Sequence, residues 1–321
     1  MSSIRTRPTP AVSVIIPAFR ASEDIAGALD SVFAQTFTHF EVIVVNDGSP
    51  DTIELEAALE PYRSRLRYFT QPNRGAGAAR NTAIRASKRR YIAFLDADDR
   101  WSPEFLARQV GYLDDHPSCD LVYCDAWITG ESPLAGRRFM ETTPSIGDVT
   151  LLSLIQQRCN IMLSTVVMRR RPLVAVKLFD ESLKRGQDFE LWLRLALNGA
   201  AMSYQPEVMA ERRVHADGLS GDAIAEIERA LNVLDRFGRA QQLPYEARTA
   251  LRIRMMALVD RLEIEQGKRR FIEGNFAAAR YHLRAAREQP LKIKAVRLAL
   301  QIAPRLFRHA YLKLLPVQLH P

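Results

Sequence analysis

The chain has 321 residues, of which 47% are hydrophobic and 26% are charged, a composition that excludes a disordered protein and suits one large domain or two ordinary ones. Its net charge of +8 is uneven: residues 1–222 hold 26 Lys and Arg against 28 Asp and Glu, whereas residues 223–321 hold 19 against 9. No stretch reaches the roughly 18 apolar residues of a spanning helix, and residues 1–10 are not followed by an apolar run of signal-peptide type, so we expect a cytoplasmic protein.

The first hundred residues alternate between short apolar runs and helical patterns. Ser22 is predicted to cap the first helix. Because Val- and Ile-rich strands that alternate with helices form parallel sheets, the predicted fold class is α/β, with a mostly parallel central sheet flanked by helices. The predicted strands are residues 12–16, 40–45, 66–69 and 91–95, and the predicted helices are residues 22–34, 52–59 and 76–86.

Polar clusters directly follow three of these strands. Ligands of parallel sheets lie outside the carboxyl ends of the strands, so the clusters are predicted to meet at one edge of the sheet and form a site. The clusters are Pro17-Ala18-Phe19, Asn46-Asp47-Gly48-Ser49 and Asp96-Ala97-Asp98-Asp99.

The pattern of predicted elements changes near residue 223. Before it, we predict helices at 103–115 and 188–197, strands at 120–123 and 165–168, and a loop at 130–147, with Arg212–His215 closing this part. After it, helical patterns run almost to the end, with breaks at Pro244, Pro290 and Pro304 and one helix-hairpin pattern at 265–287. The predicted domains are an enzyme domain at residues 1–222 and a helical, basic region at residues 223–321.

The three cysteines, Cys119, Cys124 and Cys159, follow no zinc-binding spacing. Two of them flank a predicted buried strand. We therefore expect thiols in the core and a reducing compartment.

Asp96, Asp98 and Asp99 are three acids packed behind the predicted strand at 91–95. Such packing is costly without a cation or another positive partner. A divalent cation that takes up charge on a leaving nucleotide diphosphate prefers one or two protein carboxylates, so Asp98 is the predicted metal ligand. Asp96 is placed to accept from a ribose or to hold a metal-bound water. The alternative is a turn that caps the following helix.

Two further candidates lie in turns of the predicted sheet. Asp47 can accept from a nucleobase N–H, or it can belong to an ordinary Asp-Gly turn. The Gly75-Ala76-Gly77 sequence is not a dinucleotide fingerprint, because Arg80 stands where the third glycine is needed and the motif follows the third strand. Its glycines, with Arg74 and Arg80, can approach a phosphate or simply pack closely.

Asp188 and His215 are candidates from the second half of the domain. A carboxylate at a helix start can take the proton of an acceptor hydroxyl, or it can favour the helix dipole. A neutral imidazole can bind a cation or a diphosphate, or it can be structural.

Together these segments resemble the family 2 glycosyltransferases, which have a nucleotide-diphospho-sugar transferase fold of GT-A type. The resemblance covers about residues 10–220, and the order and spacing of its motifs make it specific. The matching stretches are residues 12–19, 31–36, 44–49, 73–75 with 79–81, and 94–99.

The resemblance implies a role for each candidate on the donor side of the site. Pro17, Phe19 and Asp47 are expected to hold the nucleobase. Arg74 is expected near the base or the phosphate, and Asp96 at the ribose or the metal shell.

The resemblance also implies the residues of the chemical step. Asp98 is expected to ligate Mg²⁺ or Mn²⁺, Asp188 to be the catalytic base, and His215 to hold the diphosphate or the metal. Three positions depart from the family pattern. Ala18 stands where the family often has Thr, Arg20 where it often has Asn, and Gln187 where it often has Glu. The change at Gln187 removes a charge beside the expected base.

The implied function is inverting transfer of a sugar from a nucleotide-sugar, with UDP-sugars favoured, to a hydroxyl of a saccharide or lipid-linked saccharide in cell-surface polysaccharide or glycolipid synthesis. One alternative is a sugar-nucleotide-forming nucleotidyltransferase, which should carry a Gly-rich basic loop after the first strand. Another is a non-catalytic nucleotide-sugar-binding protein, which is expected to have lost one of Asp96, Asp98 and Asp188. We expect no nucleic-acid partner.

Residues 291–321 contain six Lys and Arg, no acidic residue, and interleaved apolar residues. This composition predicts a peripheral contact with the anionic inner face of the cell membrane. The alternatives are packing on the enzyme domain and a homodimer contact. The basic residues are Lys292, Lys294, Arg297, Arg305, Arg308 and Lys313.

Overall fold

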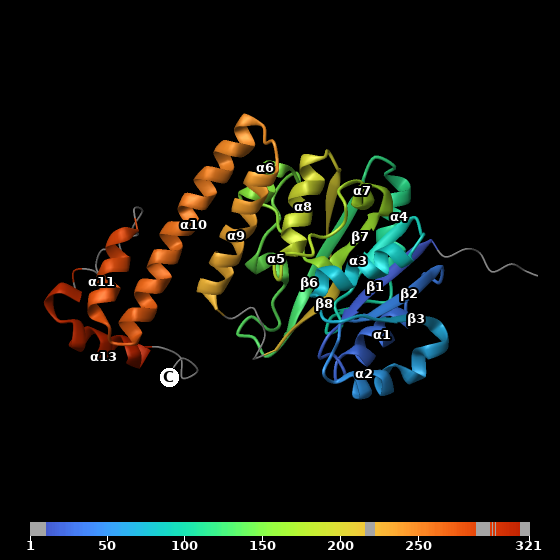
Figure 1. Cartoon of the computed structure of the whole chain (residues 1–321), viewed down its shortest axis with the longest axis horizontal. Coiled ribbons are helices and arrows are strands. Elements are labelled where there is room, and N and C mark those ends of the chain that lie inside the picture. The colour runs from blue at the N-terminus through green and yellow to red at the C-terminus, as the bar shows by residue number, and fades with distance from the viewer. Residues whose placement is uncertain (1–10, 216–221, 287–295, 297, 299, 315–321) are drawn as a thin grey trace, which may run out of the picture. The chain divides into compact units, whose positions relative to one another are not determined.

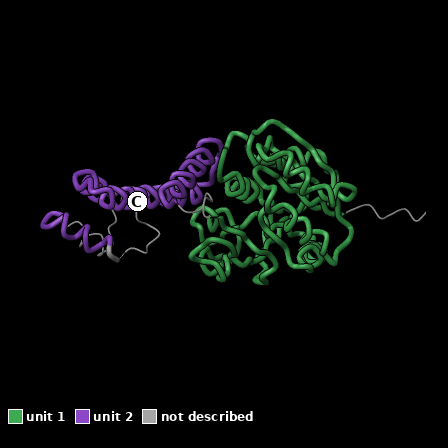
Figure 2. Tube along the Cα trace, turned by 90° about the horizontal axis from the view of Figure 1, so that it is seen from below, with its two compact units in different colours: residues 1–218 green, residues 219–321 purple. Residues whose placement is uncertain are grey.

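The computed structural model describes residues 11–215, 222–286, 296, 298 and 300–314 (Figure 1). The chain forms two compact units, residues 1–218 and residues 219–321, which we call the sheet unit and the helical unit (Figure 2). No helix in the described ranges is long and apolar enough to cross a membrane.

An eight-stranded sheet forms the centre of the sheet unit, in the order β3-β2-β1-β4-β7-β6-β8-β5. β7 runs antiparallel to both β4 and β6, so β4 and β6 point the same way, and β8 is parallel to β6. Six strands therefore end at one edge. The strands are β1 (Val12–Ala18), β2 (Phe40–Asn46), β3 (Leu66–Thr70), β4 (Tyr91–Phe94), β5 (Arg100–Trp101), β6 (Leu121–Gly130), β7 (Val166–Arg169) and β8 (Met202–Val214).

Helices cover both faces of this sheet (Figure 1). The even-numbered residues of β1 pack in one core cluster with α1, α2 and α4, because successive strand residues point to opposite faces. α3 packs on β1 and β2 from the other face. The helices are α1 (Ile25–Phe33), α2 (Thr52–Leu59), α3 (Ala76–Ala86), α4 (Phe105–Asp115), α5 (Phe139–Thr142), α6 (Leu151–Ile155), α7 (Arg170–Ala175) and α8 (Gln187–Leu197), with 3-10 turns at Glu60–Arg65 and Leu163–Thr165.

The helical unit contains α9 (Ala223–Ala240), α10 (Tyr245–Ile272), α11 (Phe276–Ala285) and α13 (Pro304–Leu314). The predicted breaks at Pro244 and Pro304 are confirmed, and Pro290 lies outside the described residues. The predicted helix hairpin is the junction of α10 and α11, where Gly274 has φ +84°.

The α/β fold with a mostly parallel sheet is confirmed, as are the four predicted strands of the first hundred residues. Two local predictions are wrong: the first helix begins at Ile25 rather than at a Ser22 cap, and the strand expected at 120–123 extends to Gly130. A further strand, β8, was not predicted. The three cysteines are buried free thiols, as predicted.

Candidate active site

The three acids after β4 lie at the edge where six strands end. Asp99 is 4% exposed, and the backbone N–H of Arg213 donates to its carboxylate at 3.0 Å. Burial, reinforced by Asp98 and Asp96, raises the pKa of Asp99 well above its usual range. Burial and the neighbouring Asp96 also raise the pKa of Asp98 to about 6. Burial, and to a lesser degree the neighbouring carboxylates, therefore disfavour the ionised forms of Asp98 and Asp99.

Arg80 is the positive partner that the packed acids require. It projects from α3, its guanidinium forms an ion pair with Asp96, and its side chain is only 7% exposed. Its Nε is buried and makes no hydrogen bond within the described residues. The backbone N–H of Asp96 donates to the hydroxyl of Ser164 at 3.1 Å, so Asp96 is held from two sides.

His215 follows β8 and faces the same cluster. Its Nε2 lies 3.6 Å from an oxygen of Asp98 and 3.4 Å from an oxygen of Asp24. The structure thus brings together Asp98 and His215, which are separated by more than one hundred residues in the sequence. Asp24, which sequence reasoning missed, joins them.

A divalent cation fits this arrangement only when it binds together with a diphosphate that supplies part of its coordination shell. Within the described residues, no group of three or more His, Cys, Asp or Glu side chains is spaced to hold a metal ion. An ion that arrives with a diphosphate needs one or two protein ligands, because phosphate oxygens and water complete its shell. Asp98 and His215 can supply these ligands, and a bound cation would favour the ionised form of Asp98, whose pKa is raised by burial and by the neighbouring Asp96.

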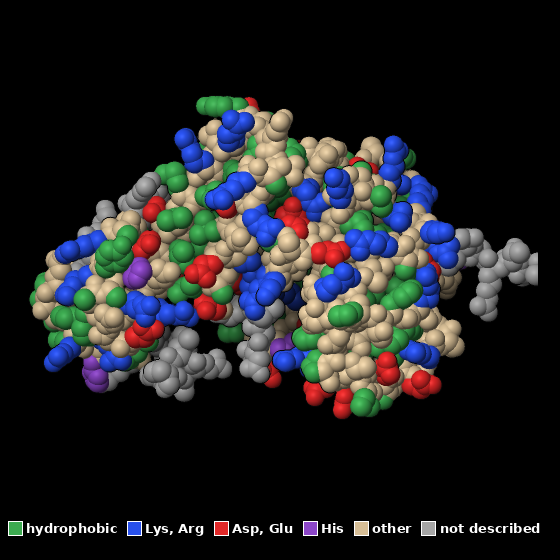
Figure 3. All heavy atoms as spheres, in the orientation of Figure 1, with side chains coloured by type: hydrophobic (Ala, Val, Ile, Leu, Met, Phe, Trp, Pro, Cys, Tyr) green, Lys and Arg blue, Asp and Glu red, His purple; other side chains and the backbone are tan. Residues whose placement is uncertain are grey.

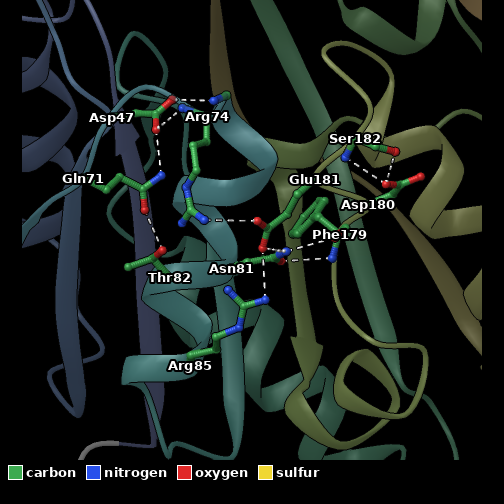
Figure 4. Close-up of polar contacts among 11 residues, drawn as sticks. Asp47, Gln71, Arg74, Asn81, Thr82, Arg85, Phe179, Asp180, Glu181 and Ser182 are labelled. Carbon is green, nitrogen blue, oxygen red and sulfur yellow. Dashed lines mark hydrogen bonds and ion pairs between the residues drawn. The ribbon is translucent and has the colours of Figure 1, made fainter.

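Asp47 holds the loop that follows β3. Its carboxylate accepts from Gln71 Nε2 at 2.7 Å and from the backbone N–H groups of Arg74 at 3.0 Å and Gly75 at 2.7 Å (Figure 4). Asp47 is only 2% exposed. Three of the roughly four acceptor positions of this carboxylate are thus occupied, which leaves about one for a nucleobase N–H.

Pro17 and Phe19 lie at the end of β1, beside the Asp47 loop. Phe19 is 45% exposed, and the guanidinium of Arg20 lies 5.6 Å from the centre of its ring. Arg20 has φ +53°, a conformation that Asn adopts more readily, and its N–H donates to Ser49 at 2.6 Å. An exposed ring at this edge can stack on a base.

Arg74 has two separate contacts. Its backbone binds Asp47, and its half-exposed guanidinium lies 3.7 Å from Glu181 (Figure 4). Glu181 also accepts from Asn81 at 2.9 Å and from Arg85 at 3.0 Å, and these partners lower its pKa. Glu181 was not predicted as part of the site.

Asp188 is the second residue of α8 and is half-buried. The preceding Gln187 packs on α3, since a Cβ on Gly77 would lie 3.3 Å from its Cγ. α3 also carries Arg80, which binds Asp96. The start of α8 and the acidic cluster are therefore connected through one helix.

The family is decided by comparison with known proteins. The glycosyl transferase family 2 profile matches residues 13–174, about half of the chain. An uncharacterized glycosyltransferase of Rickettsia typhi is 30% identical over 227 residues, which cover 68% of this chain and 69% of that protein. The chain belongs to glycosyl transferase family 2. The nucleotidyltransferase and non-catalytic alternatives are therefore wrong, and the enzyme is a glycosyltransferase.

This family 2 glycosyltransferase also resembles characterised proteins. An Escherichia coli protein named UDP-Glc:alpha-D-GlcNAc-diphosphoundecaprenol beta-1,3-glucosyltransferase WfaP is 29% identical over 228 residues, covering 71% of this chain and 86% of that protein. Staphylococcus aureus TarS, solved with UDP-GlcNAc, has a TM-score of 0.61 at 19% identity, covering 93% of this chain and 89% of that one. A Pyrobaculum calidifontis mannosyltransferase, solved with GDP-Man and Mn²⁺, has a TM-score of 0.61 at 19% identity, covering 94% and 84%. The two structures support the GT-A-type fold.

Proposed function

We propose that the enzyme transfers a sugar from a UDP-sugar to a hydroxyl of a lipid-linked saccharide, with inversion, in the synthesis of a cell-surface polysaccharide or glycolipid. One observation carries this proposal. Asp98 and His215, from the ends of two different strands, lie 3.6 Å apart at the edge that also carries Asp47 and Phe19. That edge can hold a nucleoside at one end and a diphosphate with a cation at the other.

The donor half of the site is proposed to extend from β1 to β4. Pro17 and Phe19 line the base, Asp47 accepts a base N–H, and Arg74 lies near the base or the phosphate. Asp96, held by Arg80, contacts the ribose or a metal-bound water. Uridine is favoured over guanosine because the Escherichia coli relative is named for UDP-Glc, although a neighbour in fold was solved with GDP-Man.

The chemical step is a direct displacement at the anomeric carbon. Asp188 takes the proton of the acceptor hydroxyl, whose oxygen forms the new glycosidic bond. The bond from the anomeric carbon to the diphosphate breaks on the opposite side, so the configuration inverts. Asp98 and His215 would hold a Mg²⁺ or Mn²⁺, which would supply positive charge for the departing diphosphate.

Two variants separate binding from chemistry. Thermal shifts of the full chain with UDP, GDP or dTDP, each with Mn²⁺ or Mg²⁺, are expected to show a metal-dependent response to UDP. Asp98→Asn is expected to lose that response. Asp188→Asn should keep it while transfer falls by about 10²–10⁴-fold, the usual contribution of a general base. A chain that responds to none of these nucleotides would contradict the proposal.

We further propose that residues 1–222 are the catalytic domain and that the helical region at 223–321 contacts an anionic membrane at the cytoplasmic face, where a lipid-linked acceptor lies. Eight of the fourteen exposed large hydrophobic side chains among the described residues belong to this region, which holds only a third of the chain. They are interspersed with Lys and Arg (Figure 3). Ile302 and Leu306 are 76% and 72% exposed, with the exposed Arg305 beside them. Lys292, Lys294 and Arg297 of the predicted membrane segment lie outside the described residues.

Vesicle flotation tests this contact. The full chain is expected to float with phosphatidylglycerol vesicles but not with phosphatidylcholine vesicles. A variant with Ile302→Ser and Leu306→Ser should float less, whereas Ile53→Ser, which removes an 81% exposed side chain from α2, should not. Equal flotation of the three proteins would refute the membrane contact, and concentration-dependent dimers lost in the double variant would indicate a homodimer contact instead.

A further inference from the structure

One face of α10 is exposed and apolar at its centre. A groove of about 570 Å³ lies along this face, lined by α10 between Arg248 and Glu263 and by Ala285 of α11. Met256 and Val259 in this groove are 45% and 46% exposed, although α10 also packs against α9 and α11. Contiguous apolar surface that is rimmed by polar residues marks interaction sites. We call the groove-lining surface of α10 the α10 face.

The residues of the α10 face recur with the spacing of paired helices. Arg252, Met255 and Val259 are separated by three and four residues, which is the seam pattern of helices that pack lengthwise on each other. Met255 and Met256 lie at the middle of this seam, and flexible thioether side chains adapt to the surface of a partner. The spacing therefore favours another helix as the occupant of the groove.

The charges of the α10 face are segregated about its apolar centre. Arg252 precedes Met256 by four residues, and Asp260 follows it by four. Arg248 precedes Met256 by eight residues, and Glu263 follows it by seven. At a rise of 1.5 Å per residue, the inner pair lies about 6 Å from Met256 along the helix, and the outer pair about 11–12 Å from it. The face thus has a basic end and an acidic end at matching distances from its middle.

We propose that the α10 face binds the same face of a second copy of this chain, with the two α10 helices antiparallel. A twofold axis through Met256 places Arg252 opposite the partner's Asp260. The same axis places Arg248 opposite the partner's Glu263. Parallel helices would place like charges opposite each other, so the charges select the antiparallel orientation. The inference does not depend on the proposed function, and it does not use the side chains chosen to test the membrane contact.

Contacts within the chain leave capacity for these pairs. Arg248 donates to the carbonyl of Leu243 at 3.1 Å, and a guanidinium has five N–H donors. One oxygen of Glu263 lies 2.8 Å from Nδ1 of His282, and a carboxylate has about four acceptor positions. Arg252 is exposed. A partner can therefore bind these groups without breaking the contacts that hold them.

Analytical ultracentrifugation of the full chain over a concentration series tests the contact. The wild type is expected to form a dimer. A residue on a twofold axis meets its own copy, so Met256→Glu brings two carboxylates together and should weaken the dimer about 100-fold. Val174→Glu is the matched control, because Val174 in α7 is 43% exposed and lies outside the α10 face. Its dimer should equal that of the wild type.

Two charge variants test the antiparallel orientation. One carries Arg248→Glu and Arg252→Glu, which makes both ends of the face acidic. The other carries Asp260→Lys and Glu263→Lys, which makes both ends basic. Each is expected to be a monomer by itself, and an equimolar mixture is expected to form a heterodimer, because every charge then meets its opposite. Recovery in the mixture also excludes misfolding as the reason for the loss.

Three results would overturn the inference. They are a wild type that stays monomeric at every concentration, a Met256→Glu variant that dimerises like the wild type, and a mixture of the two charge variants that stays monomeric. A monomeric wild type whose Met256→Glu variant also melts at a lower temperature would show, in addition, that another part of the same chain covers the α10 face.

Discussion

The guanidinium of Arg74 lies 3.7 Å from the carboxylate of Glu181, so the loop after β3 is joined to the segment before α8 (Figure 4). The backbone N–H of Arg74 binds Asp47 at the same time. One residue thus connects the proposed nucleoside pocket with the segment that leads to Asp188. Both side chains are partly exposed, at 51% and 31%, so an incoming diphosphate can compete with Glu181 for the guanidinium.

Arg74→Ala is expected to weaken UDP binding about tenfold, equal to about 1.4 kcal/mol, because it removes a cation from the donor pocket. The backbone contact to Asp47 remains, and the exposed ion pair contributes about 1 kcal/mol at most, so the melting temperature should hardly move. Calorimetry with UDP measures the first effect. Arg85→Ala is the control, since Arg85 pairs with the same Glu181 at 3.0 Å from a position farther along α3. Equal losses in both variants would show that Arg74 acts only through Glu181.

Asn81 is predicted to be essential for the position of the segment before α8. Its side chain accepts the N–H of Phe179 at 3.0 Å and donates to the carbonyl of Phe179 at 2.9 Å, and it is only 1% exposed. Asn81→Ala leaves two buried backbone groups without partners and should cost about 2–4 kcal/mol in urea unfolding. Asn198→Ala, which removes an exposed Asn bonded to the carbonyl of Arg194, should cost less than about 0.5 kcal/mol. A small cost for Asn81→Ala would mean that Phe179 finds other partners.

Burial explains which strands could be predicted from the sequence. β1 and β2 are buried on both faces, so their residues form continuous apolar runs. β8 includes Pro206 and several charged residues and is mostly half-exposed, so no period marks it. Because His215 directly follows β8, its chemistry alone left a ligand role and a structural role open, and the family resemblance favoured the ligand role.

The residues of the site likewise divide into those that the sequence pattern reveals and those that only the fold brings together. Asp96 and Asp98 are evident because they stand two positions apart directly after a strand. Asp24, Ser164 and Glu181 reach the site only through tertiary contacts. At Gln187, the family pattern implies only that a charge is missing. In the structure, its Nε2 donates to the carbonyl of Leu183 at 2.8 Å, a bond that an ionised Glu cannot make.

Asp98 should make the stability of the metal-free protein depend on pH. Its folded pKa of about 6 exceeds the usual value of 3.8, so protonation favours the folded state. The contribution of Asp98 to stability is thus fully present below pH 3.8 and is lost as the pH rises through about 6. Asp98→Asn should raise the melting temperature at pH 7.5 by about 2–4 °C, the shift from about 1 kcal/mol after screening of a 39% exposed side chain, and by less near pH 5. An equal shift at both pH values would refute the raised pKa.

The raised pKa of Asp98 also predicts weaker cation binding in acid. A cation must displace the proton of Asp98, so Mn²⁺-dependent UDP binding is expected to fall about tenfold for each pH unit below 6. Calorimetry between pH 5 and pH 8 measures this dependence, and titration with UDP alone corrects for protonation of the nucleotide. A Mn²⁺-dependent UDP affinity that does not change with pH would show that Asp98 does not bind the cation.

Gly48 is predicted to be irreplaceable because two independent constraints meet there. Its φ is +65°, where an L residue costs about 1–2 kcal/mol, and a Cβ would lie 2.6 Å from the backbone nitrogen of Asn73. Gly48→Ala must therefore displace the loop that binds Asp47, so it should lower both unfolding free energy, by more than about 2 kcal/mol, and UDP affinity.

Two other glycines separate these constraints. Gly136→Ala has the same kind of strain, at φ +83°, but no atom within 4 Å of the added Cβ, so it should cost only about 1–2 kcal/mol. Gly111→Ala, in α4 with open space around it, should stabilise by about 0.5–1 kcal/mol. If Gly48→Ala cost no more than Gly136→Ala and left UDP binding intact, the close approach of Asn73 would not be what holds the donor loop against Asp47.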